Sequence, residues 1–216
     1  GGTRIVSCGR HGIFVSGGTG GVYLDNMDIS VAGNCGVWID DSIGIHNREI
    51  FFGPTLFIDG CGGRGIWFDA SSVVYAEMSG TWVCSNGAAG IEVQPLQHGS
   101  FLLKMSGVKV YNNVEDGIIV NDGAFLLSGS VINGNGTGVG GGHGIWIPAD
   151  TGRSFNINGN TIIDNGKAAK GYGVNIVAGN DNFSVQGNIV MGNLQGTILN
   201  DSGVAATRLV QYNVLV

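Results

Sequence analysis

The sequence has 216 residues and a formal net charge of -6, with 43% hydrophobic and 12% charged residues. An acidic chain without a basic run is unsuited to a polyanion, so we expect no nucleic-acid partner. No apolar stretch reaches the roughly 18 residues of a membrane span, so we expect no membrane insertion. The 41 glycines occur in an otherwise apolar sequence, which indicates an ordered periodic structure rather than a flexible chain.

Three sequence markers recur in phase along the chain, about every 26 residues. The first is Gly followed by an aliphatic, a variable and an aliphatic residue, and it begins at Gly12, Gly36, Gly65, Gly90, Gly117, Gly144, Gly173 and Gly196. The second is an apolar residue followed three positions later by Asn or Cys, at Cys8, Asn34, Cys61, Asn86, Asn113, Asn135, Asn165 and Asn193. The third is a Gly three residues before that apolar position, as at Gly80 and Gly107. A period of this length is typical of a solenoid, propeller or array.

The pattern inside one unit selects among these architectures. Phe101–Leu103, Val108–Val110 and Ile118–Val120 are short runs separated by Gly and Asn, and they predict three strands in each unit. A propeller blade needs four strands, and leucine-rich repeats need a different frame. We therefore predict an all-β, right-handed parallel β-helix of about eight coils, in which each strand stacks on its equivalent and the Asn residues form a ladder.

With these markers the chain resembles the right-handed parallel β-helix superfamily, the pectin-lyase-like fold, over nearly its whole length. The resemblance implies architecture and says little about chemistry. We expect residues 1–203 to form a β-helix segment of a longer chain, truncated at both ends, because the repeat begins in phase at Gly2 without a cap. We expect residues 204–216 to leave the solenoid as a strand.

The cysteines and histidines do not suggest a metal or cofactor site. Cys8 and Cys61 share a ladder position two coils apart, about 9.6 Å by the strand spacing, which is too far for a disulfide. We expect all four cysteines to be free thiols. His11 and His143 are separated by five coils, and no Cys/His cluster has ligand spacing, so we predict no metal and no cofactor.

The Gly-anchored strands carry the candidate site. If positions one and three after each Gly point inward, positions two and four point outward. The second positions then include Trp38, Trp67 and Trp146, and indole faces stack on sugar rings. Polar residues that could bind sugar hydroxyls are Arg64, Gln94 and Asn121. This strip predicts a polysaccharide site, and burial against another subunit is the alternative.

Paired carboxyl groups on this strip suggest glycoside hydrolysis. One carboxyl must act as acid and a second as nucleophile or base, at about 5 to 5.5 Å for retention or 6.5 to 9.5 Å for inversion. Asp40 and Asp69 are one coil apart, as are Asp69 and Glu92, so we predict these three as catalytic residues. The alternative is that these three residues are solvated surface carboxylates without a catalytic role.

A second candidate site combines Asp116 with His143. Gly142-His143-Gly144 resembles the Gly-His-Gly of polygalacturonases, in which it follows a coil with paired Asp residues. Asp116 matches the second Asp of that pair. Glu115 departs from the first, and Ala88-Ala89-Gly90 stands where that family has Asn-Thr-Asp, so the match is partial.

The leading hypothesis is binding and cleavage of a bacterial surface polysaccharide by an extracellular or virion-borne protein. The chain is similar to phage tailspike depolymerases, and this resemblance implies a homotrimer. Hydrolysis is favoured over β-elimination because the first hundred residues contain no Lys. The alternative is a non-catalytic carbohydrate-binding or structural segment of an adhesin or virion spike.

Overall fold

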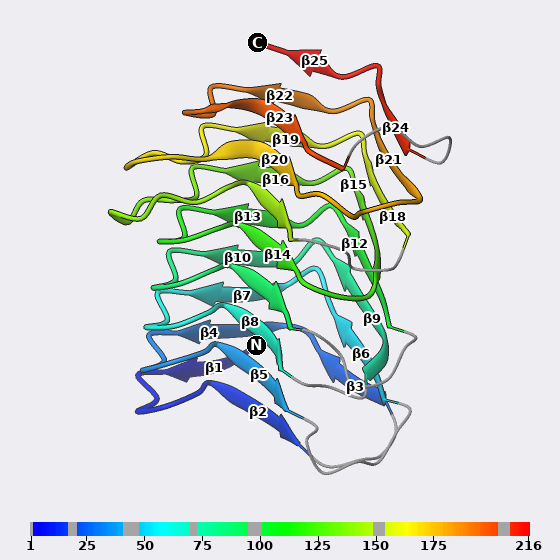
Figure 1. The fold of residues 1–216 in the computed structure, drawn as a ribbon. Helices are drawn as coiled ribbons and strands as arrows, with labels where there is room; N and C mark the ends of the chain where they lie inside the picture. Colours follow the sequence, from blue (N-terminus) through cyan, green and yellow to red (C-terminus); the bar gives the residue numbers. More distant parts are fainter. Residues whose placement is uncertain are drawn as a thin grey trace.

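The computed structural model describes residues 2–16, 21–40, 48–69, 73–94, 101–148, 154–202 and 208–216. In these residues the chain forms three parallel sheets, of nine, eight and eight strands, and no helix. Each sheet pairs a strand with the one three strands later in the sequence, so the chain winds through all three sheets in every coil (Figure 1). The predicted all-β parallel β-helix is confirmed.

The strands of the three sheets follow in stacking order. Sheet A contains β1 (Thr3–Val6), β4 (Met27–Ser30), β7 (Leu56–Asp59), β10 (Trp82–Cys84), β13 (Lys109–Tyr111), β16 (Val131–Asn133), β19 (Thr161–Ile163), β22 (Ile189–Met191) and β25 (Val214–Leu215). Sheet B contains β2 (Ile13–Ser16), β5 (Val37–Asp40), β8 (Ile66–Asp69), β11 (Ile91–Val93), β14 (Ile118–Val120), β17 (Ile145–Ile147), β20 (Tyr172–Ile176) and β23 (Gly196–Asn200). Sheet C contains β3 (Gly21–Leu24), β6 (Arg48–Phe52), β9 (Val73–Ser79), β12 (Leu102–Ser106), β15 (Ala124–Ser128), β18 (Phe155–Asn158), β21 (Phe183–Gln186) and β24 (Arg208–Gln211).

The Gly-anchored repeat corresponds to sheet B, and its register follows the sequence marker. Val37 pairs with Ile66 and Ile66 with Ile91, each one residue after its Gly. The final repeat is shifted by one residue, because Gly196 pairs with Tyr172 rather than with Gly173. The marker at Gly196 therefore does not set the register of β23, although it sets that of the earlier coils.

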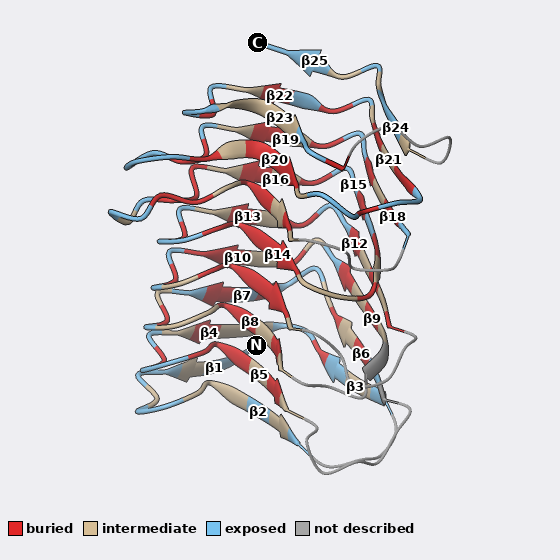
Figure 2. Ribbon diagram, viewed as in Figure 1, coloured by how far each residue is buried: buried red, intermediate tan, exposed pale blue. Residues whose placement is uncertain are grey.

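The core fills the space between the sheets with the residues predicted to point inward. On β5 and β8 these are Val37, Ile39, Ile66 and Phe68, each 0% exposed. Figure 2 shows buried stretches on successive strands of the middle coils, whereas the strands at the two ends of the solenoid are more exposed. Equivalent residues stack directly, since parallel strands in register lie about 4.8 Å apart. The core therefore repeats along the axis and has no single centre.

The predicted asparagine ladder is present from Asn86 to Asn193, but Asn34 does not belong to it: Ile29 pairs with Ile58, so Ala32 takes the ladder position in that coil and Asn34 is exposed. The four side chains before Asn193 each donate from Nδ2 to Oδ1 of the Asn one coil later, at 2.8 to 2.9 Å. Cys61 continues it through its backbone N–H, which donates to Asn86 Oδ1 at 3.1 Å. The buried amides are thus satisfied by one another and by backbone carbonyls, which avoids the cost of burying unpaired polar groups.

A second ladder lies at the corner between sheets C and A and was not predicted. Asn160 donates to Asn188 and Asn188 to Asn213, both at 2.9 Å. Ser130 precedes them and donates its backbone N–H to Asn160 Oδ1 at 2.9 Å. Two corners of the solenoid are therefore fixed by side-chain amides.

Glycine has different physical roles at the first and third markers. Gly107 lies at a corner and adopts φ +62°, the left-handed region that favours Gly. Gly65 is required because of space instead: a Cβ there would lie 2.6 Å from the Gly90 carbonyl oxygen of the next coil. At the start of the sheet B strands, Gly therefore permits close stacking of successive coils.

The C-terminal segment differs from the expectation that residues 204–216 leave the solenoid. β24 pairs in register with β21, and β25 pairs with β22, so the described residues 208–216 add to sheets C and A. The physical reason is that Asn213 continues the second ladder and Val210 pairs with Val185. Residues 204–207 lie outside the described ranges.

The four cysteines are free, as predicted, with Cys35, Cys61 and Cys84 buried and Cys8 half-buried. The described part of the chain contains no helix that is long and apolar enough to cross a membrane.

Candidate functional site

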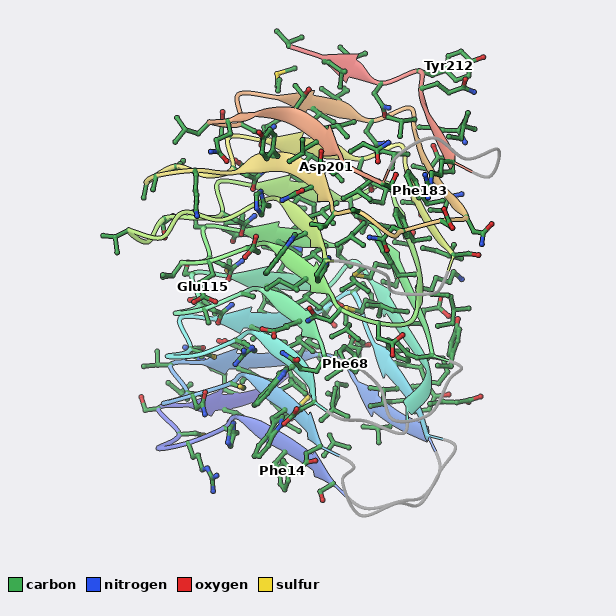
Figure 3. The ribbon with its side chains drawn as sticks, in the orientation of Figure 1. Phe14, Phe68, Glu115, Phe183, Asp201 and Tyr212 are labelled. Atoms are coloured by element: carbon green, nitrogen blue, oxygen red, sulfur yellow. The ribbon has the colours of Figure 1, made fainter. Side chains whose placement is uncertain are left out.

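The outward face of sheet B brings several of the predicted residues into one column. Trp38 on β5 pairs with Trp67 on β8, which pairs with Glu92 on β11. Phe14 on β2 precedes them, 51% exposed, and projects from the end of the solenoid in Figure 3. The column is less open than predicted, because the two indoles are half-buried and Glu92 is only 4% exposed.

The two tryptophans stack on each other. Their ring centroids lie 5.5 Å apart with the planes 12° from parallel. Arg64 places its guanidinium 4.4 Å from the Trp67 ring centroid, and His11 lies 4.6 Å from Trp38. Neighbouring groups therefore cover the indole faces that were predicted to stack on sugar rings, and the ring edges are what this column can present.

Glu92 is held by polar partners on both of its carboxylate oxygens. Arg64 donates from Nε to Oε2, and Gln94 donates from Nε2 to Oε1. A carboxylate that is both buried and engaged in this way is fixed in place, and its oxygens are not free to approach a substrate. The geometry makes Glu92 an anchor for Arg64 rather than one member of an acid pair.

Asp40 and Asp69 form the carboxylate pair that the structure brings together. They are direct register partners on β5 and β8, so their Cα atoms are about 4.8 Å apart, and both are half-buried. Burial raises the pKa of Asp69, and the charge of Asp40 raises it further. The nearby Trp38 indole opposes this rise, although its Nε1 has no partner at hydrogen-bonding geometry. Within the pair, Asp69 is therefore the carboxyl group whose protonated form is favoured relative to a solvated Asp.

Residues immediately before the repeat glycines form a second column on this face, which we call the preglycine column. Three of its members contact the outward column one coil later: His11 packs on Trp38, Arg64 donates a hydrogen bond to Glu92, and the His143 ring is hydrogen-bonded to Asn175. The column contains His11, Cys35, Arg64, Ala89, Asp116, His143 and Tyr172. Aligning the residue before each Gly would have revealed this column from the sequence.

Asp116 and His143 meet in this column, but through the backbone of His143. The Asp116 carboxylate accepts the His143 backbone N–H at 2.7 Å. Asp116 is 9% exposed, and burial raises its pKa to about 6. The carboxyl group is therefore partly protonated near neutral pH, and its local role is to hold the turn that precedes β17.

The His143 imidazole is held in its neutral form. Its Nδ1 accepts the Tyr172 backbone N–H at 2.9 Å, so the ring proton resides on Nε2. Nε2 lies 3.1 Å from the Asn175 side-chain amide, which must turn its oxygen toward the ring to accept that proton. Burial lowers the pKa of His143 to about 4. Both nitrogens are committed to structural hydrogen bonds.

The remaining predicted residues lie farther along the sheet. Asn121 donates from Nδ2 to the Val93 carbonyl at 2.9 Å, so its amide fixes the end of β14. Trp146 on β17 is three strands beyond Trp67, about 14 Å by strand spacing, and lies 6.2 Å from the His143 ring. Ile119 separates it from Glu92 in the column. The predicted strip is thus two clusters and not one continuous platform.

No family model, curated protein or solved structure matches this sequence. Among the described residues, no group of three His, Cys, Asp or Glu side chains is arranged to hold a metal ion. The functional reading of sheet B therefore depends on the geometry of Asp40, Asp69 and their aromatic neighbours.

Proposed function

We propose that this chain is a β-helix segment that binds a bacterial surface polysaccharide and cleaves it by glycoside hydrolysis with Asp40 and Asp69. The observation that carries the proposal is the register pairing of these two carboxyl groups, together with the raised pKa of Asp69. Trp38 and Trp67 lie two residues before them on the same strands, so their edges border the acid pair.

The chemistry follows from the asymmetry of the pair. Asp69 acts as the acid and gives its proton to the glycosidic oxygen, while ionised Asp40 attacks the anomeric carbon and forms a glycosyl ester. Water then displaces Asp40, and Asp69 takes up the proton of that water. Adjacent positions on neighbouring strands favour the shorter carboxyl separation, about 5 to 5.5 Å, and hence retention of configuration.

The wider setting belongs to the same proposal. A parallel β-helix with glycan chemistry on its outer face is similar to a phage tailspike depolymerase, which points to a homotrimer on a virion or another extracellular surface. The half-buried aromatic column supports this assembly, because an aromatic strip of this kind suits contact with a second subunit.

A second candidate function is a non-catalytic segment of an adhesin or spike that binds carbohydrate or serves only as a shaft. It is favoured by the mutual stacking of Trp38 and Trp67 and by the fully engaged Glu92, which resemble an internal packing layer. On this reading Asp40 and Asp69 are surface carboxylates at the edge of that layer.

The test is release of reducing ends from a panel of capsular and O-antigen polysaccharides. We expect the parent chain to be active on one of them and Asp69→Asn and Asp40→Asn each to lose at least about a thousandfold, the scale of a lost acid or nucleophile. Asp201→Asn is the matched control, an exposed carboxylate after β23 (Figure 3). Full activity in both variants would contradict the assignment, and binding without release would favour the second candidate.

A further inference from the structure

Sheet A carries a hollow on its outward face that is separate from the carboxylate pair of sheet B. Its volume is about 540 Å³, within the usual range of small-molecule sites. Two adjacent columns form it: Asp28, Phe57 and Trp82 in one, and Asp59, Cys84 and Tyr111 in the other. It lies between coils of the regular repeat and needs no inserted loop.

The aromatic walls of this hollow leave the Phe57 ring partly open, whereas Lys109 lies over one face of Trp82, with its Nζ 3.9 Å from the ring centroid. Phe57 is 41% exposed, and its ring is tilted by 51° from that of Trp82, with centroids 5.2 Å apart. Trp82 in turn meets Tyr111 edge-on at 75° and 6.2 Å. Because the three rings are angled to one another, they form a concave wall rather than a closed stack.

The polar groups of the hollow are acceptors in fixed positions. Asp28 accepts from Arg4 Nε at 2.8 Å and from the Ser30 hydroxyl at 2.5 Å. Asp59 accepts the Cys84 thiol at 3.3 Å. Burial raises the pKa of Cys84 to about 11, and the hydrogen bond to Cys84 raises that of Tyr111 to about 12. Both donors thus stay protonated, and Asp59 is oriented by a neutral partner.

The charges around the hollow are balanced. Arg4 pairs with Asp28, and Lys109 brings its ammonium 3.9 Å from the centroid of the Trp82 ring. Together with Asp59, the formal charges of these groups sum to zero, so the hollow exerts little electrostatic attraction on an ionic ligand. What it offers is apolar ring surface beside carboxylate acceptors. This combination complements a ligand with an apolar face and several hydroxyl donors.

We propose that the sheet A hollow is a binding site for a neutral hexopyranose unit, with the sugar face against Phe57 and Trp82 and its hydroxyls donating to Asp28 and Asp59. The site goes beyond the hydrolysis proposed for sheet B and does not depend on it. A chain that carries both sites can hold a polysaccharide at one face while the other face acts on it.

The experiment uses the indole N–H resonances of the nitrogen-labelled chain. The four tryptophans provide an internal comparison, since Trp82 lies on sheet A while Trp38, Trp67 and Trp146 lie on sheet B. Trp82→Phe assigns the sheet A signal. The probes are methyl glucopyranoside, methyl galactopyranoside and methyl mannopyranoside, with tetramethylammonium chloride as a cationic competitor for the aromatic wall.

We expect at least one pyranoside to shift the Trp82 resonance saturably, with Kd on the order of 1 mM for so small a ligand. Asp59→Asn should weaken binding at least about tenfold, since it removes a charged acceptor, whereas the matched Asp201→Asn should not change it. If Asp59→Asn disturbs folding, seen as loss of the sheet B resonances, Asp28→Asn takes its place and should weaken binding as well, because Asp28 is the other proposed acceptor.

Three outcomes would overturn the proposal. These are that no pyranoside moves the Trp82 signal, that only tetramethylammonium moves it, or that the shift survives both Asp59→Asn and Asp28→Asn. Movement of the Trp38 and Trp67 signals alone would support sugar binding on sheet B while overturning the sheet A site. The two proposals can therefore fail separately.

Discussion

The outward faces of sheets A and B are built from similar side chains but organised differently. On sheet B, Trp38 and Trp67 are nearly parallel, 12° apart, and Arg64 covers the Trp67 face. On sheet A, Phe57 and Trp82 are tilted by 51° beside a hollow of about 540 Å³. The first face resembles an interior layer. The second keeps a hollow beside the exposed Phe57 ring, although Lys109 lies over Trp82 as Arg64 lies over Trp67.

The difference follows from what each column repeats. A parallel β-helix places equivalent residues about 4.8 Å apart, so identical neighbours stack face to face, as two tryptophans do on sheet B. Mixed neighbours of unequal size leave gaps, as where Asp28, Phe57 and Trp82 follow one another on sheet A. Regular repetition therefore closes a face, and variation between coils opens one.

The largest expected difference between the two faces is in how much their ion pairs contribute to the free energy of unfolding. Glu92→Ala leaves the Arg64 guanidinium without its buried partner, and we expect a loss of about 3 to 5 kcal/mol in the free energy of unfolding. Urea unfolding followed by circular dichroism measures it. A loss below about 1 kcal/mol would mean that sheet B is as open to water as sheet A.

The pH dependence of stability should come from sheet B. The raised pKa of Asp116 means that stability falls as pH rises from about 4 to 6, since the folded state holds a proton that the unfolded state releases. The lowered pKa of His143 has the opposite effect. The stability that the neutral His143 contributes to the folded protein is fully present above the unfolded pKa near 6.5 and is lost as pH falls toward 4. The two effects offset each other in the parent chain.

Asp116→Asn removes one side of that balance. We expect up to roughly 3 kcal/mol more stability at pH 7, because a buried carboxylate no longer has to ionise while the amide oxygen still accepts the His143 N–H. Stability should then fall on acidification between about pH 6.5 and 4. Urea midpoints across this range provide the measurement. A less stable variant at pH 7 would contradict the raised pKa.

Aromatic coupling offers a smaller contrast. A double-mutant cycle on Trp38 and Trp67, each changed to Ala, should give a coupling energy of about 0.5 to 1.5 kcal/mol for a stacked pair. The same cycle on Phe57 and Trp82 should give less than about 0.5 kcal/mol, because Phe57 is 41% exposed and the two rings are tilted by 51°. Equal couplings would mean that the sheet A rings are packed as closely as those of sheet B.

The smallest effect is expected for the exposed ion pair of sheet A. Asp28→Asn should change the free energy of unfolding by less than about 1 kcal/mol, because Arg4 and Asp28 are 71% and 36% exposed. The same variant should weaken pyranoside binding if the proposed site is correct. A large loss of stability without any effect on binding would show that Asp28 has a structural role only.

The fold could be predicted because Gly and Asn have strict physical requirements at their positions. Only Gly allows coils to approach as they do at Gly65, and only a side-chain amide both donates and accepts along the ladder at Asn113. The prediction from these two markers is wrong at the C-terminal end, where the segment was expected to leave the solenoid. Asn213 there belongs to the second ladder, which the two markers do not include.

The candidate site was harder to predict, because alternation gives the direction of a side chain and not its neighbours. The alternation of inward and outward residues predicted that Trp38 and Trp67 lie outside the core. It could not predict that the two indoles stack on each other or that Arg64 and Gln94 hydrogen-bond to Glu92. The pairing of Asp40 with Asp69 follows from register alone and was predicted. The sheet A hollow depends on two columns together, and neither column shows a pattern when it is considered singly.

The asparagine ladder has a direction, and this affects how the solenoid folds. From Asn86 to Asn165 every side-chain amide donates from Nδ2 to Oδ1 of the Asn in the next coil, so these hydrogen bonds run in one direction and each polarises the following one. At Cys61 the series passes to a thiol-bearing residue that has no amide to contribute. We therefore expect the coils beyond Cys61 to open more cooperatively than the coils before it.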